Sequence, residues 1–409
     1  TLNAIRVRRS SDDTEQDIGF DANGDLDTTA LEAFVNEDVT KVDTDFSTDT
    51  SGTSESGLDR LANQSIGGRS GVLKGTIQAT TEEHRLIVNA VDTAPNTHRI
   101  QTSIYIPSGQ SGQTVDGFRI ENGGLEVYAT TTTKDAWVDI DVTWTSVPNA
   151  NIFIKFLPSG GAENWTGNGT DEVYIGDVTI TQTTADGAVT TWYDQSGNGN
   201  DATNSTESEQ PLVVSGGTLV EENGKAAVEF DGSDDELEDS SVSIDSTAYS
   251  AYMVANTTGN AQRALFRNRE LGGFGTREGA AFFELQSNDT LNATFIDDGS
   301  GNAIGIQSGV AVADGQHLLS TEFTTSSAAL FVDGTSTGAH DEIEAGSTPL
   351  ASVSLPYINI GGARFSRPWS DKVQEIIIFD SDQSGNRGTV TTGGGTGIEG
   401  NINTYFDIV

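Results

Sequence analysis

Residues 190–202 read TTWYDQSGNGNDA, in which β-branched and aromatic residues run directly into a polar turn rich in glycine. The first half is typical of a strand, because such side chains fit a pleated surface. In the turn, Gly197 and Gly199 suit positive φ, and the side chains of Asp194 and Asn198 can accept hydrogen bonds from nearby backbone amides. We therefore predict a turn between strands; the alternative is a ligand-binding loop.

The composition of the chain suits many short strands joined by tight turns. Of its 409 residues, 47 are Gly and only 8 are Pro, and hydrophobic residues make up 34%. Alternating segments rich in Val, Ile, Phe and Tyr recur along the chain with polar turn residues between them, a pattern typical of β-sandwiches. A chain of this length exceeds one average core, so two or three domains are expected. We predict an all-β fold with few short helices.

The charge of the chain excludes several classes of partner. Acidic residues number 61 against 21 basic ones, which gives a formal net charge of −40. Because such a surface repels phosphate groups, we expect neither nucleic-acid binding nor association with an anionic membrane. No apolar run approaches the ~20 residues that cross a bilayer, so membrane insertion is not expected. The absence of cysteine excludes disulfides and thiolate metal sites, and no cofactor other than Ca²⁺ is expected.

Alternating segments predict a succession of strands. In WVDIDVTW (137–144), apolar residues alternate with Asp139 and Asp141, and we assign Trp137 with Ile140 to the buried face of its strand. The earlier segments predicted as strands are 84–91, 99–107, 117–121, 125–131, 137–144, 151–158 and 172–182. The later ones are 188–194, 226–232, 249–256, 280–286, 291–297, 317–323, 328–334, 357–362 and 373–380.

Two short helices are expected between these strands. The segment 28–35 can begin at an N-cap provided by Asp27 or Thr28. Near the end of the chain, 398–406 has apolar residues at helical spacing. The Gly-rich segment 388–397 is expected to be a flexible loop.

Several ordered blocks of the sequence resemble the concanavalin A-like, laminin-G-like domain found in tail and capsid surface proteins of bacteriophages. A related pattern occurs in the catalytic domain of arabinofuranosidase B. The blocks are AIRVRRSSDDTEQDIGF (4–20), LDTTALEAFV (26–35), VTTWYDQSGNGNDAT (189–203), AAVEFDGSDD (226–235), EIIIFDSDQSGNR (375–387) and IEGNINTYF (398–406). The resemblance implies a sandwich of the laminin-G type.

The spacing of these blocks predicts a discontinuous domain. In the family, the helix corresponding to LDTTALEAFV runs almost at once into the strand corresponding to VTTWYDQ, whereas here the segment 38–184 intervenes. The opening and close of this segment resemble carbohydrate-binding-module jelly rolls, and insertion at an exposed loop is tolerated when the ends of the insert meet. We predict one laminin-G-like sandwich from 1–37 and 185–409, and an inserted sandwich from 38–184.

The resemblance implies a non-enzymatic protein on the surface of a phage particle, either decorating the capsid or forming part of a tail fibre. Such proteins assemble as homo-oligomers, often trimers, contact other virion proteins, and meet glycans on the host surface. The alternatives are a secreted or cell-surface carbohydrate-binding protein and an arabinofuranosidase-like glycoside hydrolase. Arg6, Arg8 and Arg9 lie on an expected edge strand and could form a subunit contact; pairing with acidic strands of the same chain is the alternative.

The segment 21–32 contains candidate calcium ligands. Asp21, Asn23, Asp25 and Asp27 place side-chain oxygens at alternate positions, and Glu32 follows eleven residues after Asp21, which is the oxygen spacing of a calcium loop. A solvated acidic turn that caps the following helix explains the same residues. A second acidic run, 231–236, is expected to be solvated.

Sugar binding needs an aromatic platform with a few polar partners. Asn164, Trp165 and Asn168 provide these in an expected loop of the inserted domain, where a Trp is not easily part of a core. Trp369 is a second candidate platform, and the alternative for both tryptophans is packing over the edge of a sandwich.

Catalysis has little support in the sequence. With 61 acidic residues, no pair of carboxylates stands out for glycoside hydrolysis. The vicinal cysteines of the arabinofuranosidase B site are absent, and four His residues occur without a recognisable nucleophile elbow. We therefore do not expect an enzyme.

Overall fold

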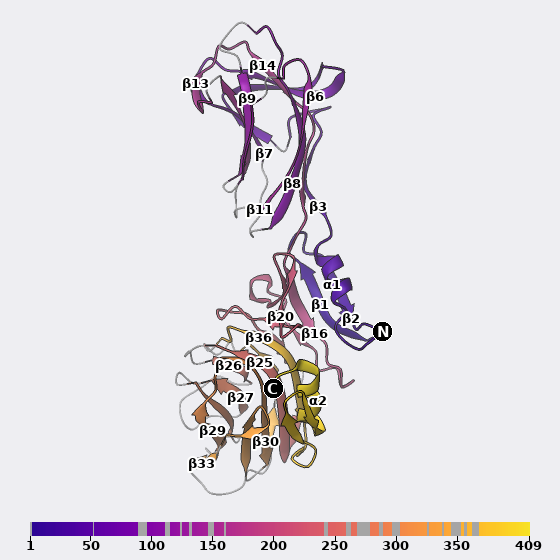
Figure 1. Ribbon diagram of the computed structural model, residues 1–409, viewed down its shortest axis with the longest axis vertical. Coiled ribbons are helices and arrows are strands. Elements are labelled where there is room, and N and C mark those ends of the chain that lie inside the picture. The colour runs from indigo at the N-terminus through magenta and orange to yellow at the C-terminus, as the bar shows by residue number, and fades with distance from the viewer. Residues whose placement is uncertain are drawn as a thin grey trace. The chain divides into compact units, whose positions relative to one another are not determined.

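The structure is a computed structural model of the chain (Figure 1). It describes residues 2–51, 53–88, 96–110, 115–122, 125–130, 133–145, 151–158, 161–240, 244–258, 263–267, 279–285, 289–296, 303–324, 327–337, 339–344, 353–355, 358–361 and 368–409.

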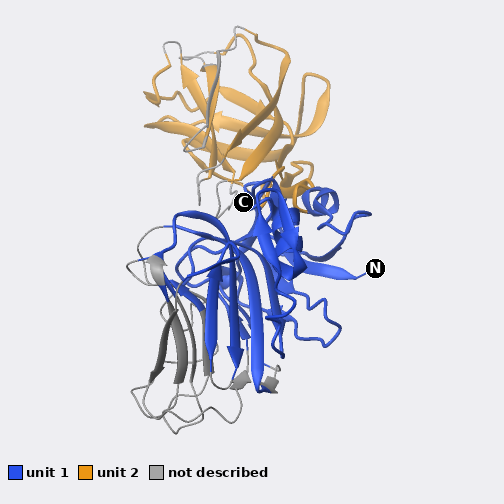
Figure 2. Ribbon diagram, turned by 60° about the horizontal axis from the view of Figure 1, so that its bottom comes forward, with its two compact units in different colours: residues 1–34, 186–409 blue, residues 35–185 orange. Residues whose placement is uncertain are grey.

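The chain divides into two compact units (Figure 2). Unit 1 comprises Thr1–Phe34 and Asp186–Val409, and unit 2 comprises Val35–Ala185. These limits differ by three residues or fewer from the boundaries expected at 37 and 185.

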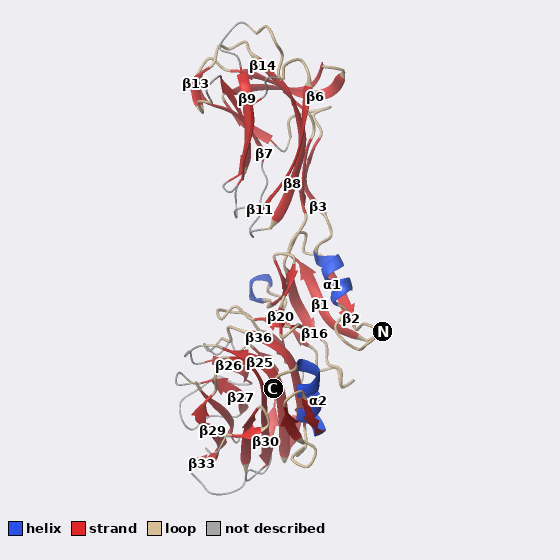
Figure 3. Ribbon diagram, in the orientation of Figure 1, coloured by secondary structure: helices blue, strands red, loops and turns tan. Residues whose placement is uncertain are grey.

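Both units are built almost entirely from antiparallel strands, as Figure 3 shows. The helices of the described chain are α1 (Thr28–Val35), α2 (Gly397–Phe406) and a short 3₁₀ helix, η1 (Glu207–Glu209). The all-β class and the two predicted α-helices are confirmed. None of the described helices combines the length and apolar character needed to span a membrane.

Unit 2 is a sandwich of two sheets. The six-stranded sheet contains β4 (Thr53–Ser56), β7 (Thr81–Val88), β9 (Val115–Asn122), β10 (Leu125–Thr130), β12 (Ile152–Pro158) and β13 (Asn164–Thr166). The seven-stranded sheet contains β3 (Val39–Thr44), β5 (Leu58–Ile66), β6 (Arg69–Ile77), β8 (Thr97–Tyr105), β11 (Trp137–Thr145), β14 (Glu172–Ile175) and β15 (Val178–Gln182).

One apolar core lies between the two sheets of unit 2. Ile120, Ile154 and Phe156 from the six-stranded sheet pack with Ile100 and Ile140 from the seven-stranded sheet. All five are buried. Because side chains alternate along a strand, the intervening residues point away from this core and form the outer face of each sheet.

In unit 1, hydrogen bonds link nineteen strands of the described chain into one network. They are β1 (Asn3–Arg9), β2 (Glu15–Gly19), β16 (Gly187–Trp192), β17 (Ala202–Thr203), β18 (Leu212–Ser215), β19 (Thr218–Leu219), β22 (Val228–Glu229), β23 (Leu237–Asp239), β25 (Ala248–Thr257), β26 (Arg263–Arg267), β27 (Gly279–Leu285), β28 (Thr290–Ile296), β29 (Ala303–Ala311), β30 (Gly315–Thr324), β31 (Ala328–Val332), β32 (Thr335–Ser336), β33 (Ala339–Glu344), β35 (Ile358–Ile360) and β36 (Lys372–Phe379). Three two-stranded ladders accompany them: β20 (Glu221–Glu222) with β21 (Lys225–Ala226), β24 (Ile244–Ser246) with β34 (Val353–Leu355), and β37 (Thr389–Thr391) with β38 (Gly394–Thr396).

The N-terminal segment is an integral part of unit 1. Strand β1 pairs with β2 on one side and with β16 on the other. The expectation that β1 is an edge strand is therefore wrong, because both of its backbone edges form ladders within the chain.

Helix α2 covers one face of the strands β25, β30 and β36. Ile402 and Phe406 of the helix pack against Tyr252, Val254 and Leu318 in one buried cluster. The preceding Gly-rich segment, expected to be a flexible loop, instead forms the β37–β38 hairpin. This expectation is wrong because the hairpin is fixed to α2 through side-chain hydrogen bonds.

Candidate functional site

The loop after β16 is a turn, as predicted. Gly197 and Gly199 have φ values of 84° and 78°. The Asp194 carboxylate accepts hydrogen bonds from the backbone N–H groups of Ser196 and Asn200 at 2.8 and 3.1 Å and from the Ser196 hydroxyl at 2.7 Å. Burial raises the pKa of Asp194, but these bonds, that of the Ser196 hydroxyl first, lower it further, so the pKa lies below its ordinary value. Gly197, Gly199 and Asp194 therefore serve the backbone geometry of the turn, whereas the bond seen at Asn198 is from its backbone N–H to Ser196 Oγ at 3.2 Å.

The two tryptophans proposed as sugar platforms are buried. Trp165 is 5% exposed and lies 4.6 Å from the ring of His84, while its Nε1–H donates to the Phe156 carbonyl at 3.2 Å. Trp369 is fully buried. The platform interpretation is wrong for both, because neither indole has a face open to a ligand.

The polar neighbours of Trp165 stabilise local structure. Asn164 begins strand β13, opposite Glu83 of β7. Asn168 accepts hydrogen bonds from the backbone N–H groups of Thr170 and Asp171, and its Nδ2 donates to the Asp171 carboxylate at 2.8 Å. These contacts make Asn168 a turn residue.

The predicted calcium ligands of the segment 21–32 are not gathered around a common point. The Asp21 carboxylate accepts bonds from the backbone N–H groups of Asn23 and Asp25, and Asp27 accepts from Ala30 at the start of α1. Asp25 pairs with Lys225 at 3.3 Å, and the side chain of Glu32 is exposed. The structure therefore corrects the calcium prediction in favour of its alternative, an acidic turn that caps a helix.

The three arginines of β1 bind acidic partners within unit 1. Arg6 makes two hydrogen bonds to Asp17, at 2.6 and 3.1 Å, while Arg8 pairs with Asp13 and Arg9 with Asp12. Arg9 also donates to the Phe34 carbonyl at 2.9 Å. The intrachain alternative accounts for the partners that these three side chains have within the chain.

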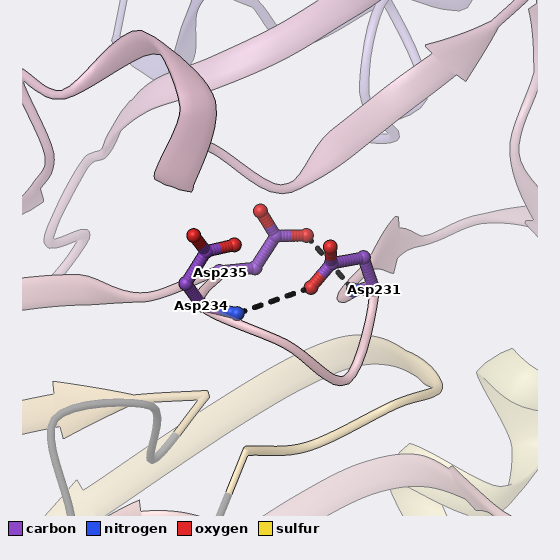
Figure 4. Close-up of side chains that lie close together, drawn as sticks. All are labelled: Asp231, Asp234 and Asp235. Atoms are coloured by element: carbon purple, nitrogen blue, oxygen red, sulfur yellow. Dashed lines mark hydrogen bonds between the residues drawn. The ribbon is translucent and has the colours of Figure 1, made fainter. Parts of the chain in front are cut away.

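A carboxylate cluster occurs in the second acidic run (Figure 4). Oxygens of Asp231, Asp234 and Asp235 all lie within 4.8 Å of one another, as a cation site requires. The cluster is also a turn: the backbone N–H of Asp231 donates to Asp235 at 2.8 Å, and Asp231 accepts from Ser233 at 2.7 Å. The expectation of full solvation is wrong for Asp235, which is 6% exposed. Burial raises its pKa to about 7, with the neighbouring carboxylates adding to the shift.

The outer face of the seven-stranded sheet carries a row of three aromatic residues. Trp137 of β11 is opposite Tyr105 of β8, which is opposite Tyr174 of β14. The ring centroids of Tyr105 lie 5.5 Å from Trp137 and 6.3 Å from Tyr174. Val72 and Ile66 complete this cluster, which is separate from the sandwich core. The two tyrosines are buried and Trp137 is half-buried, so the indole is the accessible end of the row.

A row of polar residues lies beside the aromatic row on the same face. Asp139 of β11 is opposite Ser103 of β8. Arg69 contacts both: it bonds to Asp139 at 2.9 Å and to Ser103 Oγ at 2.6 Å, and its guanidinium lies 4.6 Å from the centroid of Trp137. The rows are two residues apart on each strand, which is about 7 Å.

Further along the face, Asp141 and Arg99 form an exposed pair. Arg99 makes bonds of 2.6 and 2.5 Å to the Asp141 carboxylate, and Gln101 donates to it at 3.2 Å. The hydrogen bond from Arg99 lowers the pKa of Asp141, so this carboxylate is an anionic acceptor at neutral pH.

Sequence analysis singled out β11 but assigned Trp137 to the wrong side. Residues 137, 139 and 141 share one face of a strand, so Trp137 belongs with the two aspartates rather than with buried Ile140. Assigning side chains to the two faces of β11 strictly by the two-residue period would have placed Trp137 beside Asp139 and Asp141.

Comparison with known proteins gives only distant similarities. No known family model matches the chain, and no curated protein sequence matches it. Among solved structures, a heptameric SAP-like pentraxin from Limulus polyphemus shares 13% identity over 38% of this chain and 76% of its own, with a TM-score of 0.29. The CBM22-1 xylan-binding domain of Paenibacillus barcinonensis Xyn10C shares 13% sequence identity over 36% of this chain and 96% of its own, with a TM-score of 0.25.

Domains LG4-5 of the mouse laminin α1 chain share 13% identity over 78% of this chain and 92% of theirs, with a TM-score of 0.27. Together these are laminin-G-like and carbohydrate-binding-module jelly rolls. Similarities at this level concern the type of fold and not the ligand. The phage connection rests on the sequence blocks alone.

Proposed function

We propose that the protein binds carbohydrate without catalysing a reaction, and that the ligand contacts the outer face of the seven-stranded sheet of unit 2. We call this surface the sugar-face and define it as Arg69, Arg99, Gln101, Trp137, Asp139 and Asp141. The observation that carries this proposal is the half-buried Trp137 at the end of an aromatic row, with Arg69 and Asp139 directly beside it. Sugar rings present apolar C–H faces to aromatic side chains and hydroxyl groups to carboxylates, amides and guanidinium groups.

The arrangement of the sugar-face favours an extended glycan over a single small molecule. The accessible indole is followed along β11 by Asp139 and Asp141, each held in place by an arginine. Salt-bridged partners leave lone pairs and N–H groups on the solvent side, and they are fixed before the ligand arrives, which lowers the entropic cost of binding. Successive sugar units along the strand would meet first the aromatic group and then the polar groups.

Substitution of Trp137 tests this proposal. We expect purified protein to bind at least one class of polysaccharide on a printed array of bacterial and plant glycans, and Trp137→Ala to weaken that binding roughly tenfold or more, as loss of a central aromatic contact does. Thr143→Ala, an exposed residue on the same face of the same strand, is the matched control and should bind like the wild type.

Melting temperatures of the three proteins must agree to within a few degrees for this comparison to hold. Equal glycan binding by wild type and Trp137→Ala would remove the sugar-face from consideration. Release of reducing sugar from a bound polysaccharide would contradict the non-enzymatic part of the proposal.

We propose that this binding takes place on the surface of a phage particle, where the protein decorates the capsid or forms part of a tail fibre. There it forms a homo-oligomer and contacts other virion proteins. The support is the series of sequence blocks, from 4–20 to 398–406, that resemble laminin-G-like domains of virion proteins. Antibody labelling of particles in electron micrographs tests it: regular labelling of capsid or tail is expected, and labelling confined to cell surfaces would contradict it.

A further inference from the structure

The cations of the seven-stranded sheet of unit 2 lie beside acidic residues. Its strands, all described in full, contain five arginine and lysine side chains, one on β3, one on β5, two on β6 and one on β8. Four of these form ion pairs: Arg60 with Glu55, Arg69 with Asp139, Lys74 with Glu172 and Arg99 with Asp141. The fifth, Lys41, is two residues from Asp43 on β3. An anionic ligand that approaches a cation of these strands therefore competes with a carboxylate of the protein.

The two ion pairs of the sugar-face are about half exposed, so a ligand can reach both members of each pair. The side chains of Arg69 and Asp139 are 42% and 77% exposed, and those of Arg99 and Asp141 are 45% and 49% exposed. A sugar hydroxyl both donates and accepts hydrogen bonds, so it can bond to either member while the pair stays intact. A carboxylate or sulfate group only accepts, so it must take the arginine from its aspartate or lie beside that aspartate.

A polar row extends from the sugar-face and has a carboxylate at each end. Asp43 of β3 is opposite Thr179 of β15. Thr179 is opposite Gln101 of β8, which is opposite Asp141 of β11. Residues directly opposite each other share one face of a sheet, and neighbouring strands are about 4.8 Å apart, so Asp43 lies about 10 Å from Gln101. Asp43 is exposed. The row therefore offers a ligand one hydroxyl group and one amide between two acidic groups.

Further carboxylates lie near Arg69. The backbone N–H of Gly176 donates to a carbonyl of β8 at 2.8 Å, which holds the next residue, Asp177, against that strand. Burial raises the pKa of Asp177, the charges of Asp45 and Asp43 raise it further, and the charge of Arg69 opposes them. Three carboxylates therefore lie near one guanidinium that already has an acidic partner. Negative charge exceeds positive charge at this edge of the sugar-face.

We propose that the glycan bound at the sugar-face is uncharged, and that Asp43 and Asp177 exclude glycans that carry uronate, sialate, sulfate or phosphate groups. This inference rests on the proposed function and adds to it the class of ligand. Neutral sugar units bond to the ion pairs as they stand, whereas an anionic unit lies close to carboxylates with which it cannot pair. The formal net charge of −40 acts in the same direction over longer distances.

The glycan array that tests the proposed function also tests this inference, when neutral and anionic glycans are compared at about 50 mM NaCl, where charges are little screened. We expect the glycans that the wild type binds and Trp137→Ala loses to be uncharged. Anionic glycans should bind roughly tenfold more weakly or less, and this difference should narrow at about 0.5 M NaCl.

A matched pair of derivatives isolates the effect of charge. The best-bound neutral polysaccharide is prepared in a carboxymethyl and a hydroxyethyl form of the same low degree of substitution. The hydroxyethyl form should bind like the parent, and the carboxymethyl form roughly tenfold more weakly. Asp43→Asn/Asp177→Asn should bind the carboxymethyl form about threefold more tightly than the wild type does, and the hydroxyethyl form equally. Glu32→Gln/Glu221→Gln, which removes two exposed carboxylates of unit 1, is the charge-matched control and should bind both forms like the wild type.

If the double variant does not fold, as judged by its melting curve, Asp43→Asn replaces it with the same expected direction, since Asp43 is exposed. Trp137-dependent binding of an anionic glycan as tight as that of the neutral glycans would overturn this inference and leave the proposed function standing. So would equal binding of the two derivatives by the wild type, or equal recovery by the control variant. Absence of Trp137-dependent binding to every glycan would contradict the proposed function itself, and this inference with it.

Discussion

At the scale of single residues, burial of Asp235 makes the free energy of unfolding depend on pH. Its pKa in the folded protein is about 7, raised from an ordinary value of 3.8, with burial as the largest cause. The folded chain thus holds a proton here that the unfolded chain releases above about pH 4. The contribution of the protonated Asp235 to the stability of the folded chain is fully present below pH 4 and is lost as the pH rises through 7.

Asp235→Asn keeps a neutral side chain that can still accept the hydrogen bond from the backbone N–H of Asp231. We expect this variant to match the wild type near pH 4 and to be more stable at pH 8 by about 2 kcal/mol, a figure reduced for solvent screening. Urea unfolding at both pH values, in the presence of EDTA, measures the difference. Asp234→Asn, an exposed neighbour, is the control, and parallel stability profiles for wild type and Asp235→Asn would contradict the argument.

The residue scale is also where sequence analysis failed most. Trp165 follows glycine-rich sequence and so suggested an exposed loop, but the three residues of β13 pair with β7 and turn the indole onto His84. No local sequence pattern predicts the three-residue strand β13, because its position depends on pairing with β7, which lies some eighty residues earlier in the chain. The exposure of a single aromatic residue is set by tertiary pairing rather than by its neighbours in the chain.

At the scale of elements, residues 388–409 show how a glycine-rich segment becomes ordered. Asn403 of α2 is fully buried, and its Nδ2 donates to the carbonyls of Thr391 and Gly394 at 2.9 and 2.7 Å. Its Oδ1 accepts from the backbone N–H of Val409 at 3.0 Å. One side chain therefore joins the β37–β38 hairpin, the helix and the end of the chain.

Asn403→Ala removes all three of these bonds and leaves backbone groups without partners. We expect a loss of about 2 kcal/mol in the free energy of unfolding, since each unpaired buried group costs about 1 kcal/mol or more and some of these groups reach water. Asn401→Ala, on the exposed side of the same helix, should change stability by less than about 0.5 kcal/mol. Equal urea midpoints for the two variants would show that the hairpin is held by other contacts.

Predictions for whole elements were better where the hydrophobic period was long and clear. Segments such as 99–107 and 249–256 coincide with β8 and β25 to within two residues. The segment 172–182 splits into β14 and β15 at Gly176, whose backbone N–H bonds to the Ser103 carbonyl and leaves no room for a side chain. Sequence analysis missed the hairpin of β5 and β6. Only part of each strand is apolar, so the polar residues hide the two-residue alternation.

At the scale of the whole molecule, the spacing of sequence blocks predicted an inserted domain, and contacts within each unit explain how an insertion is possible. In unit 2, β3 pairs with β15, so the first and last strands of the unit are neighbours. In unit 1, Arg9 is opposite Gly187 and also bonds to the Phe34 carbonyl. Residues 34 and 187 therefore both lie beside Arg9, and the two ends of the interruption meet.

This geometry predicts that unit 1 survives removal of unit 2. A chain in which 36–185 is replaced by a short Gly-Ser linker should fold, because β1 and β16 keep their own ladders, α1 stays complete to Val35, and the backbone N–H of Ser10 still bonds to the Asp186 carbonyl at 2.9 Å. We expect a single cooperative thermal transition for this protein, measured by calorimetry.

The complementary fragment 35–185 should fold as well, since the residues of its core cluster all lie within unit 2. We expect it to retain glycan binding and its sensitivity to Trp137→Ala. An unfolded far-ultraviolet circular dichroism spectrum for the linked unit 1 would contradict the discontinuous domain, because it would mean that the first 34 residues depend on unit 2 for their structure. Folding of both pieces would establish that the chain consists of two independent β-sandwiches, one interrupted by the other.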